Sequence, residues 1–378
     1  ESEMNGDASV TDQLILNGNT SGDTALAVVP VSGIGQATET GIRVVDFVAD
    51  PQSVNNAAVF HLAGDQQYIN MGAYDYSLVQ DNQDWYLRSQ VVTPDPDPQP
   101  DPQPEPDSGG TDFTPVLNPK MGGYMSNLRI ANNVFNMTAQ DHAGAEHDNL
   151  KLRVDTSRDS STFGNQIDSH NDTSVVQLSA NFLNADVGEG QILAGLVGGY
   201  SNSHGDSTSS LTGRKSDNDT QGYAVGLTGS WYQDMHDHQG AYLDSWLQYA
   251  WFDNSVSEDG TGDDNYHSSG LSASLEGGYR FTLMQGNQWN WTLQPQAQVI
   301  YQGVKQEDFT ASNQSKVAQE GNDNVQTRLG LRSEWDIHPT PALHLRPFIA
   351  ANYRHNSAET SLNVDNVNFT DNTAKDSA

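Results

Sequence analysis

The sequence predicts an all-β protein whose larger part is a transmembrane antiparallel barrel. Between Ala241 and Leu283, apolar and polar side chains alternate with a step of two. Each half of this stretch is about ten residues or longer, which is enough for a tilted strand to cross a bilayer. Its aromatic residues gather toward the strand ends, as they do at membrane interfaces. We therefore expect one face of the sheet in lipid and the other toward a polar lumen.

The same alternation recurs from Asn149 to the end of the chain. It predicts residues 145–378 as a barrel domain with about nine strands. The connections alternate in length: long acidic ones such as Asp155–Asp172 are followed by short ones such as Asp186–Gly190. Outer-membrane barrels sort their connections in this way, with long loops outside the cell and short turns in the periplasm.

Composition excludes several other classes of protein. The 378 residues include 17 basic and 49 acidic ones, for a net charge of −32, and no cysteine. Such acidity excludes nucleic acid as a general partner, because phosphates need a basic surface. Without cysteine there is neither a disulfide framework nor a thiolate metal site. An acidic soluble surface adapted to salt or calcium-rich surroundings is the alternative explanation of the charge.

No run of about eighteen apolar residues is present, so we expect no transmembrane helix. The chain opens without a basic and apolar leader, and we expect it to be part of a longer protein.

Residues 1–90 contain short β-runs separated by turn residues. Leu14–Leu16 precedes an Asn-Gly turn, and further runs include 41–45 and 59–62. Dense turns with little helical periodicity predict an all-β domain. Closely spaced short strands suit the last rungs of a β-solenoid, whose end needs a cap. A small independent β-sandwich is the alternative.

Residues 91–117 are predicted to be a linker. Proline occupies alternate positions between Pro94 and Pro106, mostly beside acidic residues. Proline provides no amide hydrogen, so this segment favours an extended polyproline spacer over helix or sheet.

Residues 118–144 contain the one convincing helix. Asn118 can cap it, Pro119 suits its first turn, and Gly144 would follow its end. Its narrow apolar stripe would be poorly stable on a soluble surface but well placed inside a polar lumen. The stripe comprises Tyr124, Leu128, Ala131, Phe135 and Thr138, and the other side carries Asn127, Asn133, Asn136 and Gln140.

Several blocks resemble one family, the monomeric (type Va) autotransporters. Residues 240–254 (GAYLDSWLQYAWFDN) resemble the central barrel hairpin of that family, and 274–279, 294–298 and 324–330 resemble successive barrel blocks. Residues 130–137 (IANNVFNM) are similar to its lumenal helix. In the first domain, blocks 16–22, 72–79 and 85–89 resemble the pertactin-like cap that ends the exported passenger. These cap blocks contain Tyr74, Tyr76, Trp85 and Tyr86.

The resemblance implies a twelve-stranded barrel that ends in an aromatic residue. This chain stops at Ala378, about where a tenth strand should start, so we expect it to be truncated at both ends. The first strand also departs from the family, because residues 151–155 read Lys-Leu-Arg-Val-Asp in place of an aromatic residue and glycines. The implied partners are the barrel-assembly machinery, periplasmic chaperones, outer-membrane lipid and the chain's own upstream passenger.

Charged side chains on the inward face are expected to line the lumen and to pair across it, because charge at membrane depth is stable only when it faces inward and is partnered. Together with the helix, the expected lumen set is Tyr124, Asn127, Asn133, Asn136, Glu276, Arg280, Gln296, Arg328, Arg332 and Arg346. A sharper alternative is self-cleavage at Asn132-Asn133 assisted by Asp244 and Glu276, as in some members of the family. The histidines His142/His147 and His236/His238 could suggest a metal, but His236 and His238 fall on an expected periplasmic turn. We predict no metal site, no cofactor and no enzyme activity.

The leading functional hypothesis is a monomeric translocator in the outer membrane, with residues 1–90 at the cell surface as a template for the passenger. The alternative is a surface adhesin whose loops or cap contact other cells directly. A passive pore is disfavoured by the helix, which should fill the lumen.

Overall fold

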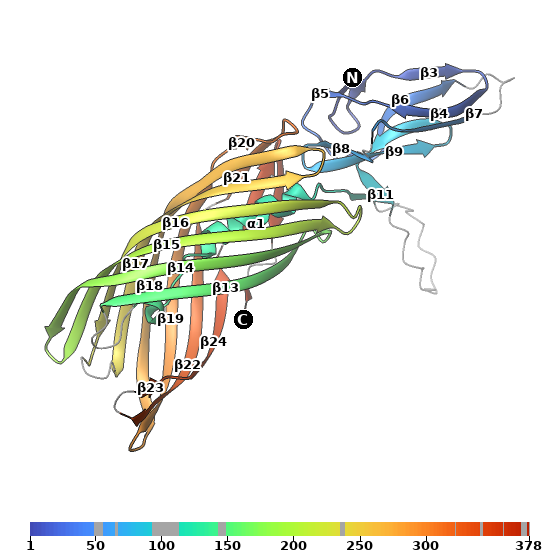
Figure 1. Cartoon of the computed structure of the whole chain (residues 1–378). Helices are drawn as coiled ribbons and strands as arrows, with labels where there is room; N and C mark the ends of the chain where they lie inside the picture. Colours follow the sequence, from blue (N-terminus) through green and yellow to red (C-terminus); the bar gives the residue numbers. More distant parts are fainter. Residues whose placement is uncertain are drawn as a thin grey trace, which may run out of the picture.

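A computed structural model describes residues 1–48, 56–64, 67–92, 113–142, 149–234, 239–321, 323–340, 343–357, 359–371 and 376–377. A long curved sheet surrounds a helix, and a smaller β-domain lies at one end of it (Figure 1). None of the described helices is long and apolar enough to cross a membrane.

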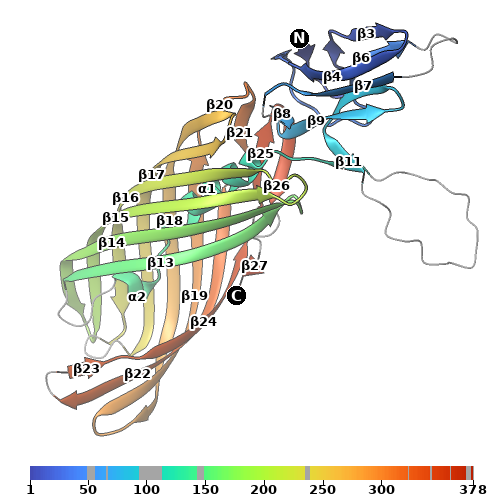
Figure 2. The same cartoon turned by 45° about the vertical axis from the view of Figure 1, so that its right-hand side comes forward.

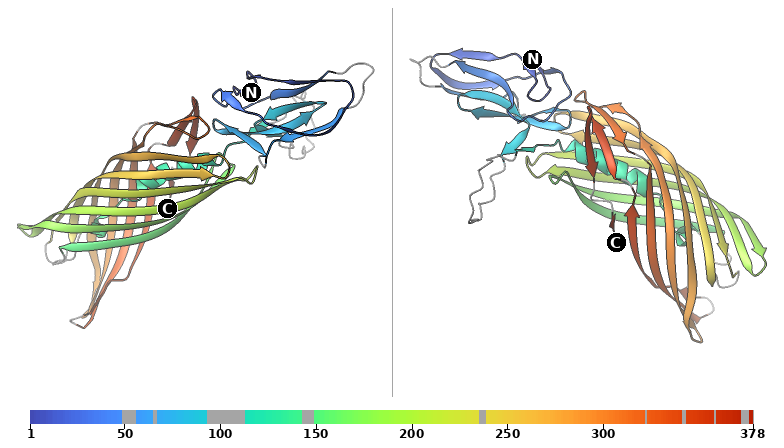
Figure 3. Two further views of the ribbon diagram at one scale, coloured as in Figure 1. Left: turned by 45° about the horizontal axis from the view of Figure 1, so that its top comes forward. Right: turned by 180° about the vertical axis from the view of Figure 1, so that it is seen from behind.

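Nine long antiparallel strands form the curved sheet in chain order, as predicted for the barrel. They are β13 (Leu150–Phe163), β14 (Ile167–Val187), β15 (Gly190–Ser209), β16 (Lys215–Tyr232), β17 (Gly240–Glu258), β18 (Gly262–Gln285), β19 (Trp289–Gln306), β22 (Asn324–Thr340) and β24 (Phe348–Asn356). The short β23 (Leu343–Leu345) joins β22, and β27 (Asp376–Ser377) pairs with β24. Figure 3 shows the sheet curving around the helix without closing on itself.

Side-chain burial in this sheet is the reverse of that in a soluble protein. On β17, Leu243, Leu247 and Trp251 are exposed on the outer face, whereas Asp244 and Gln248 are buried inside. The outer aromatic residues Tyr200, Tyr223 and Trp251 lie side by side on three neighbouring strands, with ring centroids 5.3 and 6.1 Å apart. A row of this kind marks the membrane–water boundary. The predicted lipid and lumen faces are therefore confirmed.

The expected long loops are wrong in three places. β13 and β14 remain paired up to the turn at 164–166, so most of the predicted loop Asp155–Asp172 is strand. The hairpins that turn at 210–214 and 259–261 extend in the same way. Their inward polar residues are buried, for example Ser203, Ser207 and Asn218. A stretch with polar residues on both faces resembles a loop in the sequence. Here the strand continues through it, because the side chains of its inner face pack on other polar groups.

The two remaining long connections form a separate four-stranded sheet. Its order is β20 (Phe309–Thr310), β21 (Lys316–Glu320), β25 (Thr360–Val364) and β26 (Val367–Asp371). This outer sheet lies at the same end as the small domain (Figure 2).

The lumenal segment is two helices rather than one. α1 (Lys120–Asn133) is followed by an irregular turn and then by α2 (Ala139–His142). The Oδ1 atom of Asn118 accepts a hydrogen bond from the Lys120 backbone N–H at 2.8 Å, so the expected cap is present. The expected helix end at Gly144 lies outside the described residues.

The small domain is the end of a β-solenoid, as expected, closed by antiparallel strands. β3 (Leu14–Asn17) pairs in parallel with β6 (Ile42–Val48), and β4 (Thr20–Leu26) pairs in parallel with β7 (Asn56–Leu62). Beyond β6, the sheet continues with β10 (Asp84–Arg88), β9 (Tyr74–Asp81) and β8 (Tyr68–Met71), which are antiparallel. A third sheet contains β2 (Val10–Thr11), β1 (Ser2–Glu3) and β5 (Pro30–Ser32).

The linker differs from the expected spacer at both ends. β11 (Gln90–Val92) pairs with β12 (Phe113–Pro115), so the chain returns to the same place after the proline-rich stretch. Residues 93–112 lie outside the described part of the chain.

Candidate functional site

The lumen of the barrel is occupied by α1 and α2, and a cavity of about 470 Å³ remains between the end of α1 and the strands β13, β22 and β24. At the start of α1, Lys120 Nζ forms an ion pair with Asp264 Oδ2 at 2.9 Å and donates a hydrogen bond to the Gly262 carbonyl at 2.7 Å. The Tyr124 hydroxyl donates to the same Asp264 carboxylate at 2.6 Å. The first turn of the helix is thereby fixed to the β17–β18 hairpin.

Two adjacent glycines let α1 approach the wall closely. A Cβ atom on Gly122 would lie 2.6 Å from Ile167 Cγ2, and one on Gly123 would lie 2.9 Å from Val256 Cγ1. Both distances are shorter than van der Waals contact. Glycine is ordinarily unfavourable within a helix by about 1 kcal/mol, so close packing against the hairpins is the reason for its presence here.

Side-chain amides connect the middle of α1 to the wall. Asn127 Nδ2 donates to the Tyr266 hydroxyl at 3.1 Å, and Asn127 Oδ1 accepts from Asn218 Nδ2 at 2.9 Å. Asn171 Nδ2 donates to Ser126 Oγ at 3.2 Å. Each partner is buried, so these hydrogen bonds replace the water that a lumenal helix loses.

After α1, the wall binds the backbone directly. The Phe135 carbonyl accepts hydrogen bonds from Gln177 and Gln248 at 3.2 and 3.1 Å. The Met137 carbonyl accepts from Trp246 Nε1 at 3.0 Å and Gln298 Nε2 at 2.7 Å. These carbonyls need no intrahelical partner, which accounts for the break between α1 and α2.

Two buried carboxylates hold α2 at the other end. Glu276 accepts a hydrogen bond from the Ala139 N–H at 3.1 Å and forms an ion pair with Arg328 Nη2 at 2.8 Å. Asp244 Oδ1 lies 2.9 Å from His142 Nε2, and its Oδ2 accepts from Ser230 Oγ at 2.6 Å. We name α1, the turn at 134–138 and α2 together the plug, because they occupy the lumen from one end to the other.

The structure brings some of the predicted lumen residues together and separates others. Arg328 donates to Glu276 and also to Gln296 Oε1 at 2.9 Å. Arg280 and Arg332 form a second group, each 2.7 to 2.8 Å from Glu334. Arg346 lies apart, with a side chain 46% exposed and 3.4 Å from Asp336. Asn136 Nδ2 donates to Asn133 Oδ1 at 3.3 Å within the plug.

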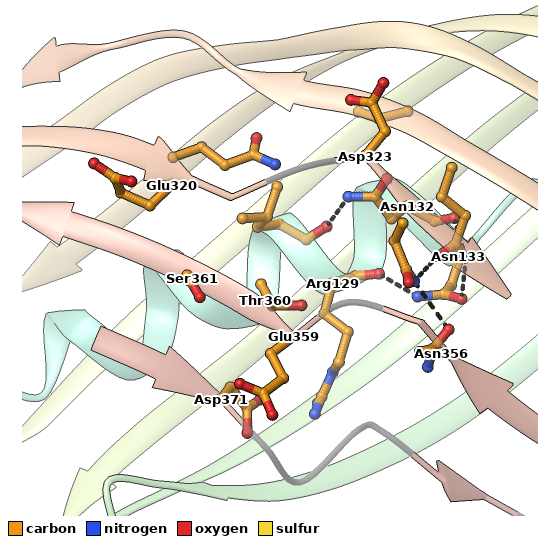
Figure 4. Close-up of a pocket in the computed structure, with 15 residues that line it drawn as sticks. Arg129, Asn132, Asn133, Glu320, Asp323, Asn356, Glu359, Thr360, Ser361 and Asp371 are labelled. Atoms are coloured by element: carbon orange, nitrogen blue, oxygen red, sulfur yellow. Dashed lines mark hydrogen bonds between the residues drawn. The ribbon is translucent and has the colours of Figure 1, made fainter. Parts of the chain in front are cut away.

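The residues proposed for self-cleavage lie in two different places. Asn132 and Asn133 end α1, and their amides donate back to the carbonyls of Leu128 and Arg129 at 3.1 and 2.9 Å (Figure 4). The described contacts of Asp244 and Glu276 are with α2 and its surroundings instead. The structure does not bring these carboxylates to the asparagine pair.

His142 falls within the range predicted for the lumenal helix, 118–144, but was not among the expected lumen residues. Its side chain is buried against Asp244. Nothing in its local sequence distinguishes it, because α2 has only four residues. His236 lies outside the described part of the chain.

Of the four predicted cap residues, three have their described contacts within the small domain and Tyr74 also contacts the outer sheet. Trp85 meets Phe60 edge to face at 5.6 Å. The Tyr76 hydroxyl donates to the Gln36 carbonyl, and burial raises the pKa of Tyr76, so it remains a donor. Tyr86 lies beside Arg88, whose guanidinium is 5.2 Å from the ring centroid. Tyr74 contacts the outer sheet through Phe369, at 6.1 Å between ring centroids.

A sheet with lipid outside, polar groups inside and a plug defines an outer-membrane translocator class of protein. The chain belongs to the autotransporter family: the sequence profile of the Autotransporter beta-domain matches residues 150–378. The Autochaperone Domain Type 1 matches residues 1–78. The barrel is thus an autotransporter β-domain, which is an outer-membrane domain.

Three proteins of Escherichia coli illustrate the similarity. The chain is 51% identical to the probable autotransporter YfaL over 99% of its own length and 30% of that protein. It is 32% identical to the uncharacterized protein YdeU, over 94% of the chain and 80% of YdeU. It is 30% identical to the autotransporter adhesin AIDA-I, over 94% of the chain and 28% of that protein. The chain therefore spans about a third of the length of YfaL and AIDA-I.

The fold matches a solved structure of the same family. The crystal structure of the transport unit of AIDA-I superposes with a TM-score of 0.62 at 27% identity, over 67% of this chain and 84% of that one. The curved sheet is therefore the fold of a transport unit.

Proposed function

We propose that this chain exports its own passenger across the outer membrane and then holds it at the cell surface. The observation that carries the proposal is the path of the chain. It runs from the small domain to the mouth of the barrel, through the lumen as the plug, and into β13 at the far end (Figures 1 and 2). No nucleotide or ion gradient acts outside this membrane, so folding of the passenger there supplies the free energy for export.

We further propose that residues 1–90 template the folding of the passenger. Within the described residues, β3 ends one sheet and β4 ends another, and together they form one rung on β6 and β7. Strands at the edge of a sheet can pair with a further rung, and β3 and β4 stand at such edges among the described residues. A solenoid grows by such stacking, which makes the cap a folding nucleus.

Deleting residues 1–90 tests the template. In a fusion that carries a β-solenoid passenger before Glu1, we expect the barrel to stay folded and the passenger to lose its protease resistance. Electrophoretic heat-modifiability measures the barrel, and proteinase K treatment of intact cells measures the passenger. A passenger that reaches full resistance without residues 1–90 would refute the template.

A point variant of the cap gives a finer measure. Leu87 is fully buried, and Leu87→Ala should destabilise the cap by about 2–5 kcal/mol through a cavity. We expect the protease-resistant passenger to appear several times more slowly in pulse–chase experiments. The exposed Val48→Ala is the matched control and should leave the rate unchanged.

The proposed partners are the barrel-assembly machinery and periplasmic chaperones, because a chain with lipid-facing strands must be kept soluble and then inserted. We propose no catalytic activity. Mass spectrometry of the junction around Asn132-Asn133 tests this part: an intact junction in the mature protein agrees with it, and a cut there establishes self-cleavage.

A surface adhesin is the second candidate. The name of the relative AIDA-I supports it, as does the outer sheet β20–β21–β25–β26 at the cell-surface end. Replacing residues 360–371 with a short glycine–serine turn should abolish adhesion of displaying cells to host cells if this candidate is correct. Unchanged adhesion would exclude the outer sheet.

A further inference from the structure

The small domain is packed on the ends of the barrel hairpins. We call residues 1–92 with 113–117 the cap, and the hairpin turns near 164, 213 and 260 with the outer sheet the mouth. One continuous buried apolar cluster includes residues of the cap, of α1 and of the mouth. Asn313 of the mouth also donates hydrogen bonds to Asn70 and the Gly72 carbonyl of the cap.

A single arginine lies at the polar centre of this contact. Arg214 Nη1 is 2.6 Å from Asp75 Oδ1 in the cap, and Nη2 is 2.5 Å from Glu258 Oε1 at the end of β17. The side chains of Asp75 and Glu258 are 0% and 3% exposed. The guanidinium also lies 5.4 Å from the centroid of the Tyr68 ring in the cap.

The start of the plug completes this site. Asn118 Nδ2 donates to Asp75 Oδ1 at 3.0 Å and to Glu258 Oε2 at 3.3 Å, so one amide contacts both carboxylates. Asn118 lies two residues before α1, and Lys120 at the first turn is fixed to Asp264. The Asn118 backbone N–H also donates to the Ala73 carbonyl of the cap at 2.8 Å, so Asn118 lies beside Asp75 within the cap and its amide meets Glu258 of the barrel when α1 is seated in the lumen.

We propose that Arg214, Glu258 and Asn118 form a docking site for the cap, and that this site is assembled only once the plug is in place. Docking then follows export, since the lumen holds α1 only after the passenger has left it. This inference rests on the proposed export function and adds a closing step. We call the three residues of this docking site the latch, because they hold the cap, which is the proposed folding template, over the mouth.

The charges explain why Arg214 is decisive. Asp75 and Glu258 are both buried, and two carboxylates in one desolvated site repel unless a cation separates them. A planar guanidinium can contact both at once with its two terminal nitrogens. The nearest further charges, Lys120 and Asp264, pair with each other.

The site should also make docking depend on pH. Burial, strengthened by Glu258 and opposed by Arg214, raises the pKa of Asp75 to about 7. An undocked, solvated Asp75 has a pKa near 4, so the docked state binds the extra proton. Docking is therefore strongest at low pH and is lost as pH rises through 7.

Between pH 6 and pH 8 the ratio of docked to undocked cap should fall about tenfold. Asp75→Asn should remove the part of this dependence that belongs to Asp75 and leave the part that belongs to the buried Glu258.

Distance measurement between two spin labels tests the latch. The chain has no cysteine, so Val59→Cys in the cap and Asp308→Cys beside the outer sheet can be labelled specifically. In the purified full chain in detergent, double electron–electron resonance should give one narrow distance for the docked cap. Arg214→Gln should reduce the docked-to-undocked ratio at least tenfold, and Asn118→Ala should reduce it several-fold.

The matched control is Arg158→Gln. Arg158 and Asp172 form an ion pair of 2.6 Å on the neighbouring hairpin, but both are exposed and the pair lies outside the site. An unchanged narrow distance in Arg214→Gln, with a heat-modifiable barrel, would overturn the docking site. An unchanged distance in Asn118→Ala would overturn its dependence on the plug. Display of the passenger on intact cells is measured separately. If the parent chain displays no passenger, the proposed export function is refuted. If a variant displays its passenger but its cap is undocked, the docking site is lost and export is retained.

Discussion

Arg328→Ala is expected to destabilise the folded chain by about 3–5 kcal/mol, because it leaves a buried carboxylate without its cation. Glu276 is fully buried, and Arg328 supplies its only ion pair among the described residues. The arginine also donates to Gln296, Gln298 and Asn352, at 2.7 to 2.9 Å. Its loss therefore removes one salt bridge and three further hydrogen bonds across the lumen.

The effect should also reach the plug. Glu276 holds the Ala139 N–H at the start of α2, so an unpaired carboxylate that draws in water would release this contact. We expect a lower urea midpoint in refolding and faster proteolysis of the plug than in the parent chain.

Arg346→Ala is the matched control for Arg328. Both arginines were assigned to the lumen lining, but Arg346 is half exposed and its ion pair with Asp336 is long. A surface pair contributes about 0–1 kcal/mol, so this variant should stay close to the parent. If Arg328→Ala and Arg346→Ala lower the free energy of unfolding equally, burial of Glu276 does not determine the loss of stability.

Gly122→Leu is expected to unseat the plug, at a cost of about 3 kcal/mol or more from overpacking. A leucine there would place its Cβ 2.6 Å from Ile167 Cγ2 and 2.8 Å from the Oγ atoms of Ser169 and Ser207. In an isolated helix the same substitution would stabilise by about 1 kcal/mol. The sign of the measured change therefore separates helix propensity from close packing.

Urea unfolding and the rate of plug proteolysis measure this variant as well. Asn132→Leu is the control, because it adds a side chain of similar size to the same helix at a half-exposed position. We expect a change of less than about 1 kcal/mol there. A stabilised Gly122→Leu chain whose plug stays protease-resistant would contradict close packing of α1 against the hairpins.

Much of the barrel followed from periodicity alone. Alternation with period two, with apolar residues in segments long enough to cross lipid, predicted the strands and both of their faces. The ends of the strands were less predictable. Residues 155–172 are mostly polar on both faces, so the sequence resembled a loop although most of it is strand. The strands at 324–340 and 348–356 have the expected apolar face, and the alternation in the sequence predicted both of them.

The sequence by itself therefore determined the β class, the lipid-facing side chains, the solenoid character of residues 1–90 and the presence of a helix before the barrel, because each depends on a local period or on turn chemistry. Only the tertiary structure decided that the plug breaks at residues 134–138, that His142 meets Asp244, and that Arg214 joins Asp75 to Glu258. Each of these contacts joins residues more than 40 positions apart or replaces a helical hydrogen bond with one from the wall. A local pattern does not encode such partners, since they are set by the register of strands around the lumen.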